Sequence, residues 1–196
     1  MIICAGSITD NNLQYTGILK TLDTQEAFRD YMLWNLQLVT NSIMFSKNIL
    51  VNKELFKVKL TRGQEEEFFS RILYSADYKE YTILSEPLFL YRQHSHSKTT
   101  ENIHYIKSNK ESEVFVYMNN FKRCLESNYR DIVNILYRRI ISLFILALKN
   151  DHLSNSKNIL QQLFHLLIKN KKLQGLEILI LGNIMLRTKV CNILLQ

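Results

Sequence analysis

The stretch GQEEEFFSRIL (residues 63–73) decides how the first half of the chain is interpreted. Three consecutive glutamates stand before two phenylalanines and an aliphatic pair, and the helix dipole favours acidic residues in a first turn. Glu67 and Arg71 are four residues apart, so they lie on one face of a helix and can form an ion pair. The stretch therefore predicts a helix whose first turn carries carboxylates, and it raises the question whether one of them does chemistry.

Upstream of this helix, short apolar runs alternate with polar turns. MIICAG (residues 1–6) predicts a short buried strand, and SITDNNLQYTG (residues 7–17) predicts a polar turn region. DTQEAFRDYMLWN (residues 23–35) predicts a helix that begins with a capping box, in which Asp23 is the N-cap and Glu26 follows three residues later.

Two segments that flank the glutamate-rich helix are expected to be extended. SIMFSKNIL (residues 42–50) predicts a strand, or a strand that leads into a helix. YTILSEPLFLYRQH (residues 81–94) predicts two short strands around Pro87, because proline cannot donate a hydrogen bond within a sheet. Residues 1–100 are therefore expected to form an α/β unit.

The second half of the chain has a different character. Residues 101–196 contain helical segments rich in leucine and isoleucine, separated by polar links such as NDHLSNS (residues 150–156). The apolar residues between Ile140 and Leu148 cover nearly the whole circumference of their helix, which indicates a buried helix. We place the boundary near residues 97–102 and expect an all-α extension beyond it, so that the chain is predominantly helical overall.

Composition and charge narrow the class of protein. Five glycines and one proline among 196 residues favour helices over a turn-rich β sandwich. Residues 1–100 hold 11 Lys/Arg and 11 Asp/Glu and the other residues hold 14 and 7, so the net charge of +7 lies in the second half. A basic half suits nucleic acid, an anionic membrane surface or a phosphate-bearing ligand equally well.

The cysteines and the hydropathy pattern suggest a cytoplasmic protein. Cys4, Cys124 and Cys191 are far apart and odd in number, and they are expected to be reduced thiols. The first residues lack the basic leader of a signal peptide, and no segment reaches the roughly 18 apolar residues of a membrane span.

Three stretches in a fixed order carry a resemblance: TNSIMFSKNIL (residues 40–50), GQEEEFFSRIL, and EPLFLYRQHSHSKTT (residues 86–100). Together they resemble the second half of the catalytic domain of a family 2 glycosyltransferase, a nucleotide-sugar-dependent enzyme of the GT-A fold. In that family an acidic motif opens a helix beside the acceptor, and a later Tyr-Arg-x-His segment closes the site. The residues that match these two motifs are Gln64, Glu65, Glu66, Glu67, Phe68 and Arg71, and then Leu88, Tyr91, Arg92, His94 and Ser97.

The resemblance covers roughly residues 1–100 and implies the Rossmann-like acceptor half of a GT-A domain. The family's donor half comes first and carries βαβ units and an Asp-x-Asp motif, which holds a divalent metal, Mg²⁺ or Mn²⁺. This chain contains no Asp-x-Asp, and one expected strand precedes the acceptor half. The chain therefore resembles a family member without its donor-binding half.

Inverting glycosyl transfer needs a base that removes a proton from the acceptor hydroxyl, and the resemblance assigns this role to Glu65. It places Gln64, Glu67 and Arg71 in support of the motif. The alternative is that all three glutamates only face water at the start of a helix.

Other motif residues have two interpretations as well. Arg92 and His94 could face a diphosphate or a metal-bound oxygen, or they could be exposed residues at a strand end. His94 and His96 without a third ligand do not establish a metal site. Trp34 and Asn35 could line a sugar site, although a lone tryptophan is more often a core residue. Asn41 is counted with Trp34 among the residues that support the acceptor site or its motif.

The basic tail could contact a membrane. Arg138 and Arg139, with Lys169, Lys171 and Lys172, suit a peripheral surface at the inner face of the membrane, near a lipid-linked acceptor. The alternative is the solvated face of a helical bundle. Nucleic-acid binding is not expected, because no module for it is present.

The expected function is therefore transfer of a hexose from a nucleotide sugar to a glycan or lipid-linked acceptor, as in polysaccharide biosynthesis. Two alternatives stay open. The chain could be a non-catalytic remnant or a subunit that needs a donor-binding partner, or it could be a helical interaction module with a basic surface.

Overall fold

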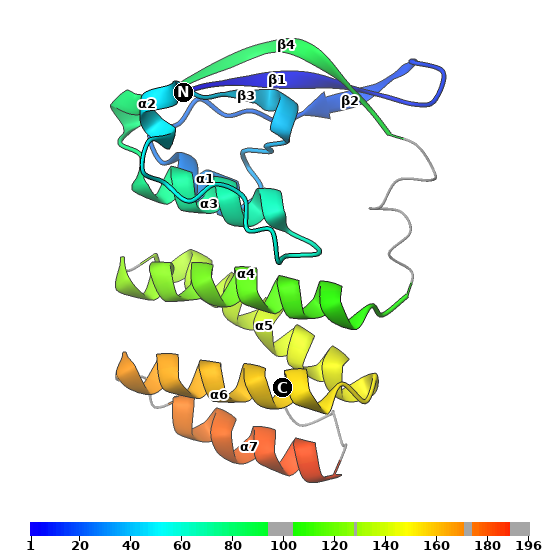
Figure 1. Ribbon diagram of the computed structural model, residues 1–196, viewed down its shortest axis with the longest axis vertical. Helices are drawn as coiled ribbons and strands as arrows, with labels where there is room; N and C mark the ends of the chain where they lie inside the picture. The colour runs from blue at the N-terminus through cyan, green and yellow to red at the C-terminus, as the bar shows by residue number, and fades with distance from the viewer. Residues whose placement is uncertain (94–103, 128, 171–173, 189–196) are drawn as a thin grey trace. The chain divides into compact units, whose positions relative to one another are not determined.

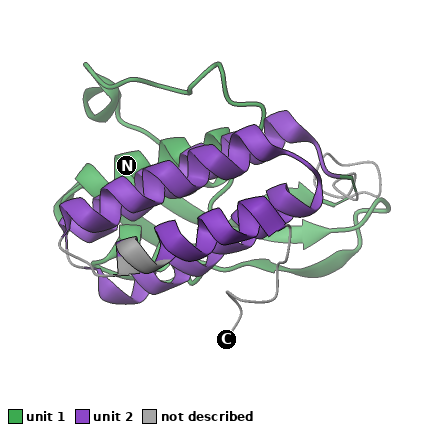
Figure 2. Cartoon of the chain, turned by 90° about the horizontal axis from the view of Figure 1, so that it is seen from below, with its two compact units in different colours: residues 1–104 green, residues 105–196 purple. Residues whose placement is uncertain are grey.

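The computed structural model describes residues 1–93, 104–127, 129–170 and 174–188. The chain divides into two compact units, residues 1–104 and 105–196 (Figure 2). We call them unit 1 and unit 2. Unit 1 combines a small sheet with helices, whereas the elements described in unit 2 are all helical.

Unit 1 is built around a mixed sheet. Strand β1 pairs in parallel with β4 along its whole length, and it pairs antiparallel with β2 and β3. Because β4 occupies one edge of β1, the two antiparallel partners share the other edge, with β3 beside Ile2–Ile3 and β2 beside Gly6–Thr9. The strands are β1 (Ile2–Thr9), β2 (Tyr15–Leu19), β3 (Ile43–Met44) and β4 (Thr82–Arg92).

Helices α1 and α3 lie on one face of this sheet (Figure 1). Ile3 and Ala5 of β1 are fully buried, while the intervening Ile2 is 40% exposed, as expected where successive side chains point to opposite faces. Phe69 and Ile72 of α3 are buried as well. The helical elements are α1 (Ala27–Met32), η1 (Thr40–Ser42), α2 (Lys47–Leu50), α3 (Gln64–Ser75) and η2 (Tyr78–Glu80).

Several expectations for unit 1 are confirmed, and the turn region is refined. The buried first strand, the strand-to-helix segment at residues 42–50 and the helix at 64–75 are all present. Residues 7–17 form a hairpin rather than one long turn, because β1 runs to Thr9 and β2 begins at Tyr15. The Asp10 carboxylate closes the turn by accepting hydrogen bonds from the backbone N–H groups of Asn12 and Gln14.

Two predictions for unit 1 are wrong. Residues 82–92 form one strand, not two, because the pairing skips residues between Leu84 and Pro87 and so absorbs the proline in an irregular edge strand. The capping box of Asp23 and Glu26 is absent. Helix α1 begins at Ala27, and Glu26 at its N-cap makes no side-chain capping bond. The Ala27 N–H donates instead to the Tyr81 hydroxyl at 3.2 Å.

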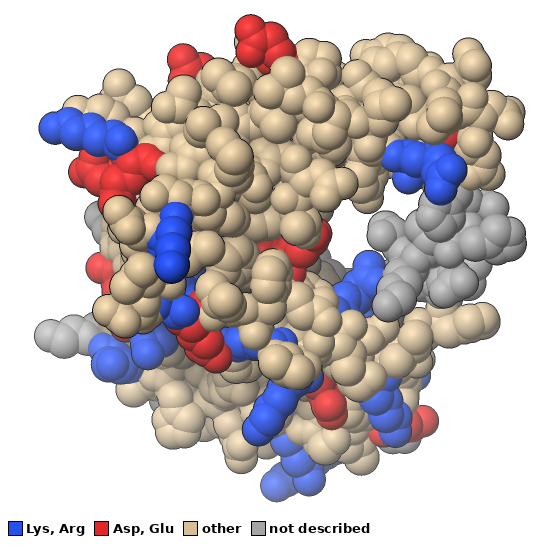
Figure 3. Space-filling model, turned by 45° about the horizontal axis from the view of Figure 1, so that its top comes forward, with Lys and Arg blue, Asp and Glu red and all other residues tan. Residues whose placement is uncertain are grey.

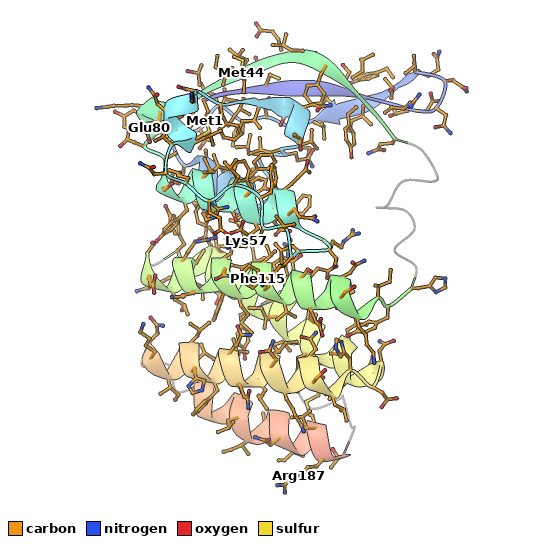
Figure 4. All side chains as sticks on the ribbon, viewed as in Figure 1. Met1, Met44, Lys57, Glu80, Phe115 and Arg187 are labelled. Carbon is orange, nitrogen blue, oxygen red and sulfur yellow. The ribbon has the colours of Figure 1, made fainter. Side chains whose placement is uncertain are left out.

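Unit 2 consists of helices that contact their neighbours in sequence, and α4 also contacts α6. Ile140, Ile141, Leu143, Phe144, Ile145 and Leu148 are buried and Leu146 is half-buried, so the expected burial of α5 is confirmed for all but one of these residues. The helices are α4 (Lys107–Glu126), α5 (Arg130–Lys149), α6 (Leu153–Lys169) and α7 (Gln174–Thr188). Figure 4 shows their side chains, with Phe115 of α4 labelled. Among the described residues, no helix has the length and hydropathy needed to cross a membrane.

The chain is thus mixed α/β with helices predominating, in agreement with the coarse expectation. Within the residues that the structure describes, its sheet contains one parallel pair and two antiparallel pairs of strands.

Candidate functional site

Glu65 stands in the first turn of α3 and is exposed to solvent. The helix begins after Gly63, whose left-handed backbone (φ 74°) suits glycine, and Gln64 turns back to donate its side-chain amide to the Leu60 carbonyl. One carboxylate oxygen of Glu65 accepts hydrogen bonds from the backbone N–H of Thr40, at 3.2 Å, and from the Thr40 hydroxyl. The motif carboxylate therefore lies against η1, which belongs to the first of the three matched stretches.

Glu67 and Arg71 form the predicted ion pair. The distance from Arg71 Nε to Glu67 Oε1 is 2.9 Å, and Arg71 Nη2 donates to Oε2 at 3.1 Å. The Glu67 side chain is 1% exposed. A buried charge pair needs further hydrogen bonds, and the guanidinium supplies them by donating to the carbonyls of Glu54 and Leu55. Arg71 thereby fastens the loop at residues 54–55 to helix α3.

An aromatic cluster formed by Phe45, Phe56 and Phe68 contacts this helix. The ring of Phe68 lies 4.5 Å from that of Phe56 and 5.5 Å from that of Phe45, measured between centroids. The Arg71 guanidinium lies 5.7 Å from the centroid of the same Phe68 ring. Such ring contacts contribute about 0.5–1.5 kcal/mol each beyond their buried area, so the cluster holds the motif helix in place.

Trp34 is not a core residue, so the alternative interpretation of this tryptophan is wrong. Its side chain is 57% exposed, and its backbone is left-handed with φ 64°. The Trp34 N–H donates to the Tyr31 carbonyl and the Asn35 N–H to the Asp30 carbonyl, which is the hydrogen-bond pattern of a Schellman motif. Glycine usually occupies this position, and a side chain there costs about 1–2 kcal/mol.

The buried side chain of Asp30 stabilises the turn at Trp34 and Asn35. Asp30 is 5% exposed, and its carboxylate accepts hydrogen bonds from the Thr24 hydroxyl at 2.5 Å and from the Asn35 side-chain amide at 3.1 Å. Each oxygen of the Asp30 carboxylate therefore accepts one hydrogen bond, from Thr24 before the helix and from Asn35 after it. These two bonds stabilise the turn that contains Trp34.

An open pocket of about 470 Å³ lies beside Trp34. This volume is within the usual range of ligand sites in proteins. Its lining residues are Ile18, Lys20, Thr21, Leu22, Trp34, Asn35 and Ser85. Glu65 is not among them, so the pocket and the motif glutamate are two separate features of unit 1.

The remaining site candidates are dispersed. Asn41 is exposed in η1, next to the Thr40 that binds Glu65. Arg92 is exposed at the end of β4, opposite Thr9 in the sheet register. His94, with His96 and Ser97, lies outside the described residues. Among the described residues, no three His, Cys, Asp or Glu side chains gather where a metal ion could be held.

A titratable cluster in unit 2 was missed by sequence reasoning. His152 is 4% exposed; its Nδ1 lies 2.9 Å from the Tyr105 hydroxyl and its Nε2 lies 3.0 Å from a Glu111 carboxylate oxygen. Burial raises the pKa of Tyr105, so this phenol stays protonated and can donate to Nδ1. Tyr105 and Glu111 precede His152 by 47 and 41 positions, so no local motif could have revealed the cluster.

The described cysteines carry no site. Burial raises the pKa of the Cys124 thiol to about 12, which keeps it in the unreactive thiol form near neutral pH. Cys4 is half-buried, and both residues are free thiols.

Comparison of the chain with family models, with curated proteins and with solved structures gave no match.

Proposed function

We propose that unit 1 is the acceptor half of a GT-A glycosyltransferase of family 2, and that Glu65 is the base which takes the proton from the acceptor hydroxyl. The proposal rests on the resemblance of the three motif stretches. The observation that carries it is the position of Glu65, exposed in the first turn of α3 and in contact with Thr40 of the first stretch.

Local order around Glu65 supports the proposal. A general base must be held within hydrogen-bonding reach of its proton donor. Thr40 fixes one oxygen of the Glu65 carboxylate, which leaves the other oxygen to meet an acceptor. The ion pair of Glu67 and Arg71 begins two residues further along and ties the helix that carries the base to the loop at residues 54–55.

The second proposed component is a donor-binding half. In the family this half binds the nucleotide sugar and the Mg²⁺ or Mn²⁺ that stabilises the departing diphosphate. The described residues include no group that could hold a metal, so we assign no metal ligand and no step that depends on one to this chain. A glycan or lipid-linked acceptor would meet the chain at Glu65.

A non-catalytic role is the second candidate, and one observation favours it. The hydrogen bonds from Thr40 to Glu65 join two segments of unit 1, so Glu65 could serve the fold alone. The two roles differ in the effect of Glu65→Gln, because an amide can still accept hydrogen bonds from Thr40 but is not a base.

The test compares turnover with stability. The chain alone, assayed with Mg²⁺ or Mn²⁺ against a panel of nucleotide sugars, is expected to form no specific product. When the chain is joined to a donor-binding half, we expect it to transfer sugar from a nucleotide sugar to an acceptor. Glu65→Gln should then lower the rate of this transfer by roughly 10²–10⁴-fold and leave the melting temperature unchanged.

The neighbouring substitution Glu66→Gln is the matched control and should cost little activity. Equal losses for the two substitutions would refute the assignment of the base. Specific product formation by the chain alone would refute the need for a donor half.

A further inference from the structure

The pocket beside Trp34 has the composition of a carbohydrate subsite. A sugar ring presents apolar C–H groups on its faces and hydroxyls around its rim, so a site for it combines an exposed aromatic face with dispersed polar groups. Trp34 supplies the aromatic face and is flanked by the exposed aliphatic side chains of Ile18 and Leu22. Thr21, Asn35 and Ser85 supply polar groups on the same lining.

The backbone of Trp34 is a second, independent indication. A left-handed conformation is disfavoured for a bulky residue and is retained where the surroundings enforce it, often at functional positions. At this helix end glycine would satisfy the same hydrogen bonds without strain. The chain therefore keeps a tryptophan whose side chain is 57% exposed at a position that favours glycine.

The positive charge of Lys20 in the pocket lining indicates which class of sugar the pocket favours. Among the described residues that line the pocket, Lys20 is the charged one, and it is exposed between β2 and α1. Two hydrogen bonds to Gln37 fix its backbone. The Lys20 N–H donates to the Gln37 side-chain carbonyl, and the Gln37 N–H donates to the Lys20 backbone carbonyl. An ammonium group beside an aromatic platform favours a ring that carries a carboxylate or a phosphate.

We propose that this pocket binds an anionic sugar, a hexuronate or a hexose phosphate, with its ring on Trp34 and its charge on Lys20. The identification of that sugar as part of the acceptor rests on the proposed function. Binding itself does not, because Glu65 does not line the pocket and no turnover is needed to observe binding.

The chain carries its own probe for this site. Trp34 is the single tryptophan of the sequence, so intrinsic tryptophan fluorescence reports on this pocket alone. The intact chain is titrated at low salt with glucuronate, glucose 6-phosphate, glucose and inorganic phosphate. We expect saturable quenching or a spectral shift with one or both anionic sugars, at most a weak response to glucose, and none to inorganic phosphate.

The response pattern decides between the two ligand sources and the competing explanations. A response to glucuronate alone identifies a carboxylate, and one to glucose 6-phosphate alone identifies a phosphate. Equal responses to glucose and to the anionic sugars would overturn the role of Lys20. A response to inorganic phosphate equal to that of the sugar phosphate would overturn the sugar site, and no response to any sugar would overturn the proposal entirely.

Substitutions separate binding from folding. Lys20→Gln should raise the dissociation constant of the anionic sugar by roughly 3–10-fold, consistent with loss of an exposed charge-assisted contact. Lys59→Gln, an exposed lysine outside the pocket, is the control and should change nothing. Trp34→Gly removes the platform and relieves the left-handed strain, so binding measured by ligand-observed NMR should vanish while the melting temperature stays equal or rises. Retained binding in Trp34→Gly would refute the site.

These outcomes are independent of catalysis. Binding without turnover in the chain joined to a donor half would leave the subsite standing and refute the proposed transferase. Turnover without binding of the anionic sugar would refute the subsite and leave the proposed transferase standing.

Discussion

Units 1 and 2 bury their residues in different ways. Unit 2 packs continuous apolar surfaces, such as Leu136, Ile140 and Phe144 along α5. Unit 1 instead buries charges and gives each a partner, as for Glu67 with Arg71 and for Asp30 with Thr24 and Asn35. It also exposes its tryptophan on a strained turn. Unit 2 also buries polar side chains, namely His152 beside Tyr105 and Glu111, and Asn120 and Asn155. The two units therefore differ in which polar groups they bury: among the described residues, the buried carboxylates lie in unit 1.

The largest expected effect tests the buried charges of unit 1. Glu67→Gln leaves the Arg71 guanidinium without its charged partner and loosens the loop that it fastens. Removal of one partner from a buried pair costs about 3–5 kcal/mol. Chemical denaturation of the intact chain measures this loss.

The control is a glutamate in an exposed ion pair of the same unit. Glu26 lies 3.7 Å from Arg29 and its side chain is 58% exposed, so Glu26→Gln should cost less than about 0.5 kcal/mol. A similar loss in the free energy of unfolding for both substitutions would show that the buried ion pair stabilises the chain no more than the exposed one.

The second prediction tests the apolar packing of unit 2. Leu163 of α6 is 1% exposed, and Leu163→Ala should destabilise the chain by about 2–5 kcal/mol through lost burial and a cavity. Ile180 of α7 is 61% exposed, so Ile180→Ala should stay within about 0.5 kcal/mol of the parent. Thermal unfolding followed by circular dichroism at 222 nm, which in unit 2 reports helix loss, checks both, and an equal shift would contradict the apolar core.

The third prediction returns to the sheet of unit 1. A Cβ added at Gly6 would lie 2.4–2.7 Å from three ring atoms of Phe89, so Gly6→Ala should cost about 1–3 kcal/mol through overpacking. Gly17 in the neighbouring strand is the matched control, because its added Cβ would meet only Ile8, at 3.9 Å. Gly17→Ala should therefore be neutral or slightly stabilising. The comparison fails if Gly17→Ala is the more damaging change in urea unfolding.

The smallest expected effect concerns the basic residues of unit 2. Arg139 lies over the Tyr117 ring, 5.5 Å from its centroid, and so has a partner within the bundle. Basic and acidic side chains are interspersed on the face drawn in Figure 3. Because most of the apolar residues of α5 are buried, we expect the intact chain to bind neutral and anionic vesicles equally poorly in co-sedimentation at low salt. Salt-sensitive preference for anionic vesicles would restore the membrane interpretation.

The sequence predicted the elements better than the details that join them. Helical periodicity located α3 and the burial of α5, and the four-residue spacing predicted the contact between Glu67 and Arg71. Local patterns could not predict that Pro87 would be absorbed in one continuous strand, because its partner strand lies at the other end of the unit.

The candidate sites show the same limit. The matched motif located Glu65, but its contact with Thr40 depends on how two distant segments meet. The exposure of Trp34 depends on tertiary structure, and no local sequence pattern distinguishes it from a buried tryptophan. The contacts of His152 with Tyr105 and Glu111 also depend on tertiary structure, because these residues are far apart in the sequence.

The parallel pairing of β1 with β4 has a consequence for the order in which the protein assembles. Ile2 pairs with Thr82 and Thr9 with Arg92, so β1 obtains its longest partner only after the intervening residues have been synthesised. At roughly 5–20 residues per second, β1 waits on the order of 4–16 s with its other edge satisfied at most by β2 and β3. Closing such a long loop also slows folding relative to helices that contact their neighbours in sequence. During this interval one edge of β1 is unpaired, and an unpaired strand edge can associate with other chains.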